Sequence, residues 1–307
     1  MQYTKPALTF EEQADLLLHR GMSGDRDLMI ARLSCVNYYR LSGYWYPFRD
    51  AADQFAPGTS FDEIWNCYAF DRRLRLLVID AVERVEVTVR TLLAYEHAHA
   101  HGPFAYAEDS QTLPNLGAAE LSDFLARVTE EADRSREIFV THFKEKYGDC
   151  HRHLPVWEAT EIMSLGTLVR FFTGATPAVK AAVASRFGVP DKVLRSWLLA
   201  LNAARNISAH HGRMWNRVSG MKPYIPRSYR HPDWHRPVKI ENDRIFGLLT
   251  ICRYCLREIA PQSAPGRTGW LHSCVSFPRY RWLTWGFPRI GRPRPSGPDC
   301  MVHRIFP

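Results

Sequence analysis

The sequence lacks the features that mark several large classes of protein. No run of about 18 apolar residues is present, so we expect no membrane-spanning segment. The N-terminal stretch MQYTKPALTFEEQADLL has neither the basic start nor the apolar core of a secretory signal, so we expect a cytoplasmic protein. Glycine-rich phosphate loops, a serine nucleophile elbow and paired metal-binding carboxylates are also absent.

Cysteine is sparse and irregularly spaced. The chain has seven cysteines, an odd number that argues against a disulfide framework. Cys252 and Cys255 form a CxxC pair, but the pair lies in an apolar run and no second pair or finger-spaced histidines accompany it. We therefore expect buried thiols here, with a zinc site as the alternative, and we expect no metal and no cofactor in the protein.

Acidic residues are scarce in one part of the chain only. Lysine and arginine number 40 against 32 acidic residues, a formal net charge of +8. Residues 1–204 carry 22 basic and 27 acidic side chains, net −5, whereas residues 205–307 carry 18 and 5, net +13. This asymmetry favours a polyanionic partner such as RNA. The alternative is an arginine-rich tail that only keeps the protein soluble.

Strand patterns and internal repeats do not stand out, whereas helical periodicity is frequent. Thr9 with Glu12, and Ser60 with Glu63, form capping boxes at two helix starts, and Gly102-Pro103 ends the second of these helices. With an apolar fraction of 46%, the pattern predicts a globular all-α protein. The helices are expected over residues 9–20, 25–34, 60–101, 118–147, 154–172, 177–187, 191–217 (with Asp191 as the cap) and 240–259.

An aromatic block lies between the second and third of these helices. Residues 37–49 contain six aromatic side chains among thirteen residues. Such a cluster can form a platform on which nucleic-acid bases stack, but more often it is part of the core. We favour the core interpretation.

The densest polar stretch lies where the basic excess begins. Residues 205–217 read RNISAHHGRMWNR and contain three arginines, two adjacent histidines and two asparagines. The apolar residues before it recur at helical spacing, which predicts that one helix continues through the stretch. On that helix one polar stripe would contain Asn202, Asn206, His210, Arg213 and Arg217, with Arg205 beside it.

This stretch suits a phosphodiester. Histidine can transfer protons near neutral pH, and arginine can hold a phosphate and offset the charge that develops on it. The alternative is a buried His210 that only caps the helix end. We interpret Arg205, Asn206 and His210 as catalytic residues, and His211, Arg213 and Arg217 as RNA-binding residues.

A second polar face lies on the helix expected over residues 60–101. Glu83, Arg90 and His97 are spaced by seven residues, and Glu86 precedes Arg90 by four. The spacing puts a carboxylate, a guanidinium and an imidazole on one face. It allows three interpretations: a second, weaker catalytic half-site, a supporting polar role, or a surface ion pair beside a solvated histidine.

The Arg205–His210 spacing resembles the Arg-x4-His signature of HEPN domains, the helical module of many RNases, with Asn206 in the polar position that often follows the arginine. The longer string RNISAHHGRMWNR resembles the most diagnostic block of the Abi-like abortive-infection proteins AbiD and AbiF. Residues 37–49, 83–102 and 157–172 resemble other blocks of the same family. The resemblance covers about residues 5–259, with a trace to Pro288.

This resemblance implies an all-α, HEPN-like helical bundle with an N-terminal helical extension. We expect residues 1–55 to pack on a core of residues 56–260, and residues 261–307 to form an irregular tail rich in arginine and proline. The resemblance also implies a metal-independent endoribonuclease in which two Arg–His motifs meet. They would come from two chains of a homodimer, or from Arg205/His210 and Arg90/His97 of one chain.

Three functions are open at this point. The favoured one is an endoribonuclease effector of phage defence that cuts RNA through its 2′-hydroxyl, restrained by an inhibitory non-coding RNA or partner protein as family members suggest. The second is a non-catalytic RNA-binding module of a defence or toxin–antitoxin system, which would keep its RNA affinity when His210 is replaced. The third is an interaction protein whose basic tail binds another protein and whose RNA affinity would not depend on salt.

Overall fold

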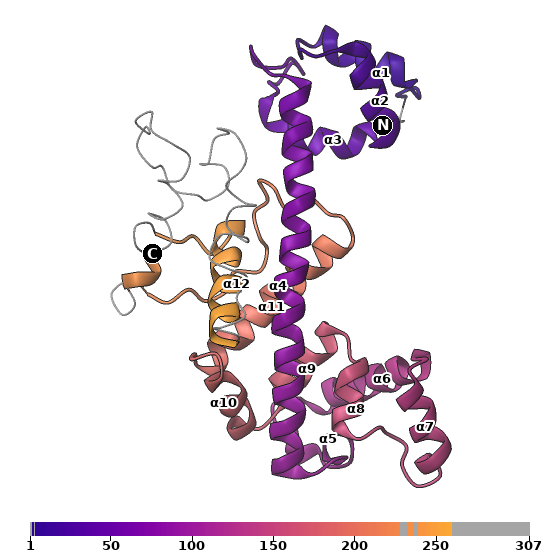
Figure 1. Cartoon of the computed structure of the whole chain (residues 1–307), viewed down its shortest axis with the longest axis vertical. Coiled ribbons are helices and arrows are strands. Elements are labelled where there is room, and N and C mark those ends of the chain that lie inside the picture. The colour runs from indigo at the N-terminus through magenta and orange to yellow at the C-terminus, as the bar shows by residue number, and fades with distance from the viewer. Residues whose placement is uncertain (1, 3, 228–231, 236–238, 260–307) are drawn as a thin grey trace. The chain divides into compact units, whose positions relative to one another are not determined.

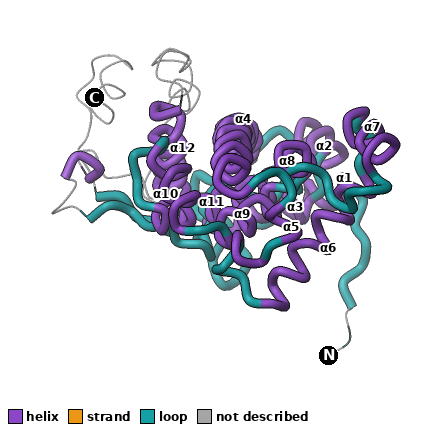
Figure 2. The backbone as a smooth tube through the Cα atoms, turned by 90° about the horizontal axis from the view of Figure 1, so that it is seen from below, coloured by secondary structure: helices purple, strands orange, loops and turns teal. Residues whose placement is uncertain are grey.

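The regular structure is helical throughout the part of the chain that the computed structural model describes, namely residues 2, 4–227, 232–235 and 239–259 (Figures 1 and 2). No strand is present among those residues, which confirms the all-α prediction. None of the described helices is long and apolar enough to cross a membrane. The α-helices are α1 (Phe10–His19), α2 (Arg26–Cys35), α3 (Tyr38–Trp45), α4 (Phe61–His101), α5 (Ala105–Glu108), α6 (Ala118–Arg134), α7 (Ile138–Tyr147), α8 (Val156–Ile162), α9 (Leu165–Gly174), α10 (Pro177–Ser185), α11 (Asp191–Ala209) and α12 (Ile245–Ile259), and the 3-10 turns are η1 (Tyr46–Phe48), η2 (Ser110–Thr112) and η3 (Pro232–His235).

The chain divides into two compact units. Unit 1 consists of Met1–Leu76 and His211–Trp215, and unit 2 consists of Leu77–His210 and Asn216–Pro307. The division lies inside α4, so the expected N-terminal segment 1–55 falls within unit 1 and the expected core 56–260 is shared between the units. The expected tail, residues 261–307, lies outside the described residues.

Local capping signals set the helix starts near the N-terminus. The Thr9 hydroxyl accepts the backbone N–H of Glu12 at 3.2 Å, and the Glu12 carboxylate accepts the N–H of Thr9 at 2.8 Å, which confirms the capping box. Asp25 caps α2, and the Ser60 hydroxyl accepts the N–H of Glu63 at the start of α4. These contacts join residues three apart, so the sequence alone could predict them.

Four expected helices are shorter or divided, and one of them is the helix expected over residues 240–259, which begins only at Ile245. The helix expected over residues 118–147 is two helices, α6 and α7, and the helix expected over residues 154–172 is also two, α8 and α9, because the chain turns at Met163-Ser164. Helix α11 begins with Pro190 at its N-cap position, so the prediction that Asp191 caps it is wrong. It ends at Ala209 instead of continuing to residue 217.

The aromatic block contributes to the core of unit 1 in part. Tyr44 and Trp45 on α3 are buried, together with Leu41 and with Phe61 of α4. This confirms the core interpretation for those side chains. Tyr39 and Tyr46 in the same block are exposed, so the core interpretation is wrong for these two side chains.

The core of unit 2 is built around α9 and α11. Helix α9 is almost entirely buried, and it packs on the apolar face of α11, which also contacts α10 and α12. The buried Trp197 of α11 donates its indole N–H to the carbonyl of Tyr224 at 2.7 Å, which ties the segment after the motif back onto the helix. Helix α11 is therefore held firmly along its length up to the motif.

Candidate active site

The motif lies at the C-terminal end of α11, where the helix stops. His210 is the C-cap residue, and its backbone N–H reaches the carbonyl of Asn206 at 3.0 Å. The next residue, His211, has a left-handed φ of 58°, which helical continuation does not allow. The prediction of one polar stripe through Arg213 and Arg217 is therefore wrong, because both residues lie beyond the helix.

Within the motif, His210 is exposed, and Arg205 and Asn206 are half-buried. The Arg205 guanidinium donates from Nη1 to Oδ1 of Asn206 at 3.2 Å. Among the described residues, no ion pair joins Arg205 to a carboxylate. The exposure of His210 argues against the alternative in which it is a buried helix cap.

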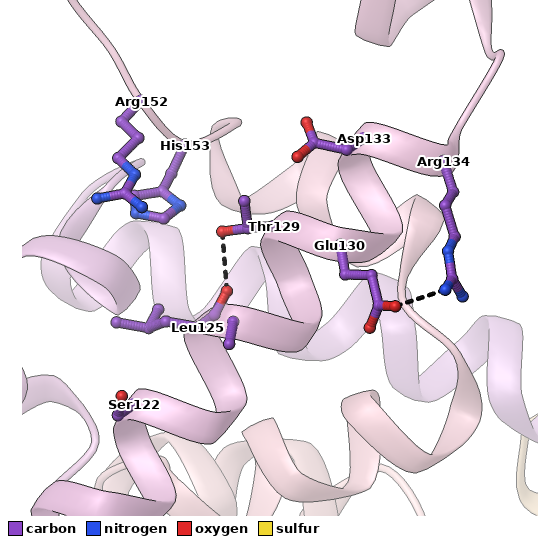
Figure 3. A pocket seen from close by; sticks show the side chains of 9 residues that line it. Ser122, Leu125, Thr129, Glu130, Asp133, Arg134, Arg152 and His153 are labelled. Atoms are coloured by element: carbon purple, nitrogen blue, oxygen red, sulfur yellow. Dashed lines mark hydrogen bonds and ion pairs between the residues drawn. The ribbon is translucent and has the colours of Figure 1, made fainter.

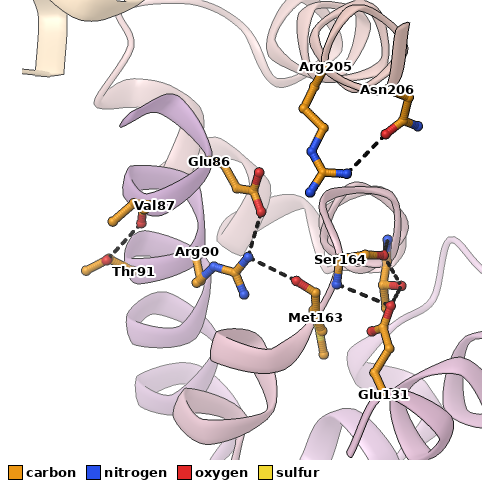
Figure 4. Close-up of polar contacts among 10 residues, drawn as sticks. Glu86, Val87, Arg90, Thr91, Glu131, Met163, Ser164, Arg205 and Asn206 are labelled. Atoms are coloured by element: carbon orange, nitrogen blue, oxygen red, sulfur yellow. Dashed lines mark hydrogen bonds and ion pairs between the residues drawn. The ribbon is translucent and has the colours of Figure 1, made fainter. Parts of the chain in front are cut away.

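A buried ion pair on α4 faces this arginine. Arg90 donates from Nη2 to Glu86 at 2.7 Å and to the backbone carbonyl of Met163 at 2.9 Å, as Figure 4 shows. In that view the Arg205 guanidinium points toward the Glu86–Arg90 pair. The pair confirms the expected four-residue spacing, but it is largely buried instead of lying on the surface.

The turn between α8 and α9 supplies the carbonyl that Arg90 uses. Because α8 ends at Ile162, the carbonyl of Met163 has no place in a helical ladder and can accept from a side chain. Glu131 of α6 holds the same turn, since its Oε1 accepts the N–H of Ser164 at 3.2 Å and the hydroxyl of Thr167 at 2.9 Å. Sequence periodicity missed this turn, and with it the polar cluster.

The structure separates His97 from the Glu86–Arg90 pair and from the turn at Met163-Ser164. His97 is fully buried, its ring packs edge-on against Phe171 with centroids 5.1 Å apart, and neither ring nitrogen has a hydrogen-bond partner among the described residues. Burial, with a smaller effect from His101, lowers the pKa of His97 to about 4. Seven helical residues also put His97 roughly 10 Å along α4 from Arg90.

An RNA phosphate therefore cannot reach His97 in this conformation. Glu83, the third member of the expected half-site, is exposed on α4, and the carboxylate that Arg90 uses is Glu86. The burial of His97 speaks against a second half-site within one chain.

Unit 1 holds the residues that follow His210 in the sequence. Asp71 of α4 is fully buried and accepts four hydrogen bonds. The donors are Tyr44 Oη at 2.6 Å, Arg75 Nη1 at 2.5 Å, and the backbone N–H groups of Met214 at 3.1 Å and Trp215 at 2.7 Å. Burial raises the pKa of the Asp71 carboxyl, and these donors oppose the rise. Four donors directed at two oxygens favour the carboxylate form.

The predicted RNA-binding residues differ in their surroundings. His211 is exposed, and its carbonyl accepts from Arg40 Nη1 at 2.7 Å. Arg213 is half-buried, donates to the carbonyl of Trp215 at 2.9 Å and lies over the Trp215 ring. Arg217, in unit 2, is exposed.

The model of one protein family, described as Abi-like protein, matches residues 31–216. The chain belongs to the Abi-like family. Comparisons with curated proteins and with solved structures gave no match. Membership of the Abi-like family indicates a part in abortive infection, a form of phage defence.

The Abi-like match begins within α2 and ends at Asn216, immediately after the segment that Asp71 holds. It therefore contains the Arg205–His210 motif, the Glu86–Arg90 pair and the Asp71 cluster. Helices α1 and α12 lie outside it. The motif, the ion pair and the Asp71 cluster therefore all lie within the part of this Abi-like protein that matches the family.

A separate pocket of about 730 Å³ lies beside α6 (Figure 3). Its walls combine an ion pair, Glu130–Arg134, with Asp133, Arg152 and the ring of His153. Burial lowers the pKa of His153, and Arg152 lowers it further. None of the predicted site residues lines this pocket.

The CxxC pair lies on the buried face of α12. Cys252 and Cys255 are both fully buried, and burial raises the pKa of the Cys252 thiol to about 12. In the described part of the chain, no group of three or more histidine, cysteine or acidic side chains is placed to hold a metal ion.

Sequence reasoning missed two carboxylates that organise these clusters, Asp71 and Glu131. Asp71 is one of several acidic residues on α4, and nothing near it in sequence marks its contacts with the backbone of Met214 and Trp215, which lie 143 and 144 residues away. Two signals were available: the four-residue spacing from Arg75, and the helical phase, which puts Asp71 with apolar neighbours such as Leu74 and Val78 on the buried face. A carboxylate on an apolar face requires a partner.

Proposed function

We propose that this Abi-like protein is an endoribonuclease that acts in abortive infection by cutting RNA at the Arg205–His210 motif. One observation carries the proposal: an exposed imidazole lies at the end of α11, five residues after a half-buried arginine that no carboxylate neutralises among the described residues. An arginine without a counter-ion can accept a phosphate. An exposed histidine five residues further along the chain can move protons near neutral pH.

The chemistry uses the nucleophile that RNA carries. The 2′-hydroxyl attacks the neighbouring phosphorus, a base takes its proton, the bond from phosphorus to the 5′-oxygen breaks, and an acid protonates that oxygen. The products are a 2′,3′-cyclic phosphate and a free 5′-hydroxyl. His210 serves as the proton-transfer group, and Arg205 offsets charge on the non-bridging oxygens. Asn206 fixes the Arg205 guanidinium through its amide oxygen.

A single imidazole supplies one of the two proton transfers at a time. The attacking and leaving oxygens lie on opposite sides of the phosphorus, so a second group is needed for the other transfer. The sequence suggested His97 of the same chain as this second group, but His97 is buried, which argues against that role. We therefore propose that a second copy of the motif comes from another chain in a homodimer.

The test compares wild type with His210→Ala and Arg205→Ala on a labelled single-stranded RNA in the presence of EDTA. His99→Ala is the matched control, because His99 is an exposed histidine on α4 outside the motif. Loss of the acid–base group should reduce the cleavage rate about 10²–10⁴-fold, while the control cleaves normally and leaves a 2′,3′-cyclic phosphate. Activity that needs added Mg²⁺, or a fully active His210→Ala, would refute the mechanism.

A non-catalytic RNA-binding function is the second candidate. The net charge of +13 over residues 205–307 favours it, because charge alone is enough for binding without cleavage. It predicts salt-dependent RNA affinity with no cyclic phosphate product from any variant. Such an outcome with a folded wild type would select this candidate over the nuclease.

A further inference from the structure

Helix α3 and the 3-10 turn η1 that follows it, both in unit 1, carry two exposed tyrosines. Tyr39 is 86% exposed and Tyr46 is 69% exposed, although Tyr44 and Trp45 of the same block are buried. Helical torsion angles continue through Tyr46, with φ −49° and ψ −40°. Because seven α-helical residues return to within about 20° of the same direction, we infer that Tyr39 and Tyr46 lie on about the same side of this segment. Gly43 lies on that side between them.

An arginine occupies the gap that Gly43 leaves. A Cβ atom on Gly43 would lie 3.3 Å from Nε and 3.4 Å from Cδ of Arg213. The missing side chain therefore lets Arg213 lie across α3 between the two tyrosines. Its guanidinium is held there by the carbonyl and ring of Trp215.

A second arginine lies beside Tyr39. Arg40 is exposed, and its Nη1 donates to the carbonyl of His211 at 2.7 Å. Among the described residues, neither Arg40 nor Arg213 forms an ion pair with a carboxylate. This part of unit 1 therefore carries two arginines that no carboxylate neutralises, together with two exposed tyrosines; a third arginine, Arg49, lies over the Tyr46 ring and pairs with Asp53.

These two features together fit single-stranded RNA. Unpaired bases stack on aromatic rings, and the phosphates between them pair with arginine. A double helix keeps its bases stacked on one another and does not offer their faces. The positive charge favours a nucleic acid over a neutral apolar protein surface.

We propose that Tyr39, Arg40, Tyr46 and Arg213 form a binding surface for single-stranded RNA, with bases on the two rings and phosphates on the two guanidinium groups. The proposal deepens the proposed function, on which it rests for the choice of RNA as ligand. It adds that the RNA must be unpaired where it binds. The residues concerned all lie in unit 1 and within the span of the family match.

The experiment measures binding in the full-length His210→Ala background, so that cleavage cannot consume the probe. The probes are a fluorescein-labelled oligouridylate and a fully paired RNA duplex of the same length. Replacing both tyrosines with alanine should weaken oligouridylate binding roughly 10- to 100-fold, whereas replacing both with phenylalanine should preserve it, because stacking uses the ring and not the hydroxyl. Tyr95→Ala, which removes an exposed tyrosine of α4, is the control and should bind normally.

Three results would overturn the proposal. They are an unchanged affinity in the double alanine variant, an equal loss in the double phenylalanine variant, and duplex binding as tight as that of the single strand. The wild-type cleavage assay is read separately. Tyrosine-dependent binding without any cleavage would support this binding surface and refute the nuclease. Cleavage that depends on His210 but not on the tyrosines would support the nuclease and refute the binding surface.

Discussion

Asp71 accepts the backbone N–H of Trp215 at 2.7 Å across 144 residues of sequence. The same carboxylate accepts the N–H of Met214, the Arg75 guanidinium and the Tyr44 hydroxyl. A side chain of α4 thus satisfies backbone donors that a continuing helix would have satisfied internally. This is why Arg213 lies against α3 and not on the polar face of α11.

Replacing Asp71 with alanine should destabilise the protein by about 3–5 kcal/mol. The change leaves the buried Arg75 guanidinium without its counter-ion and three further donors without an acceptor. Urea unfolding followed by circular dichroism measures the loss. Asp80→Ala is the control, because Asp80 pairs with Arg84 at the same four-residue spacing on a half-exposed face and should lose less than about 1 kcal/mol. Equal losses in the two variants would contradict this account.

Stability should fall as the pH drops from 7.5 to 5. The pKa of His97 is lowered to about 4 in the folded protein from the ordinary 6.5. In this window the unfolded chain binds a proton that the folded chain does not, so acid favours unfolding, by about 2 kcal/mol at pH 5 for this group. Below about pH 4 both states are protonated and the contribution stops growing.

The measurement is urea unfolding of wild type and His97→Leu at the two pH values. Leucine removes the titrating group from its position against Phe171 while filling a similar space. The variant should therefore lose about 2 kcal/mol less than wild type between pH 7.5 and 5. Parallel pH profiles for the two proteins would show that His97 is not the group responsible.

Removal of Arg90 should cost about 3 kcal/mol. Its side chain and that of Glu86 are 9% and 15% exposed, so Arg90→Ala leaves a largely buried carboxylate and the Met163 carbonyl without a donor. Arg84→Ala removes a half-exposed arginine with the same spacing on the same helix and should cost less than about 1 kcal/mol. The comparison uses the unfolding midpoints of both variants, and a milder effect at Arg90 than at Arg84 would count against a buried ion pair there.

Deleting residues 289–307 should weaken RNA binding without abolishing cleavage. This segment contains four arginines and none of the motif residues. For a single strand, the log–log slope of affinity against salt should become shallower by about 0.7 for each phosphate that the shortened protein no longer neutralises. Fluorescence anisotropy over a range of salt concentrations gives the slope for both proteins. A slope near zero in the intact protein would remove the electrostatic argument altogether.

Features that depend on neighbours in sequence were predictable. Thr9 with Glu12 and Ser60 with Glu63 are contacts over three residues, and Glu86 with Arg90 is a contact over four, so each follows from helical geometry alone. The helical class follows from the same periodicity. The start and the apolar face of α11 also follow, because its apolar residues recur up to Ala204, but its end at Ala209 does not, since the same pattern predicted a helix to residue 217.

The tertiary structure decided where helices stop and which polar side chains are buried. The sequence determined an all-α chain with the Arg205–His210 motif on or after an amphipathic helix, because these depend on local spacing. It did not determine the turn at Met163-Ser164, the burial of His97 or the path of residues 211–215, because these depend on Glu131, Phe171 and Asp71, which lie far away in sequence. A polar group taken out of water must find a partner or remain uncharged, and only the folded chain decides which partner is within reach.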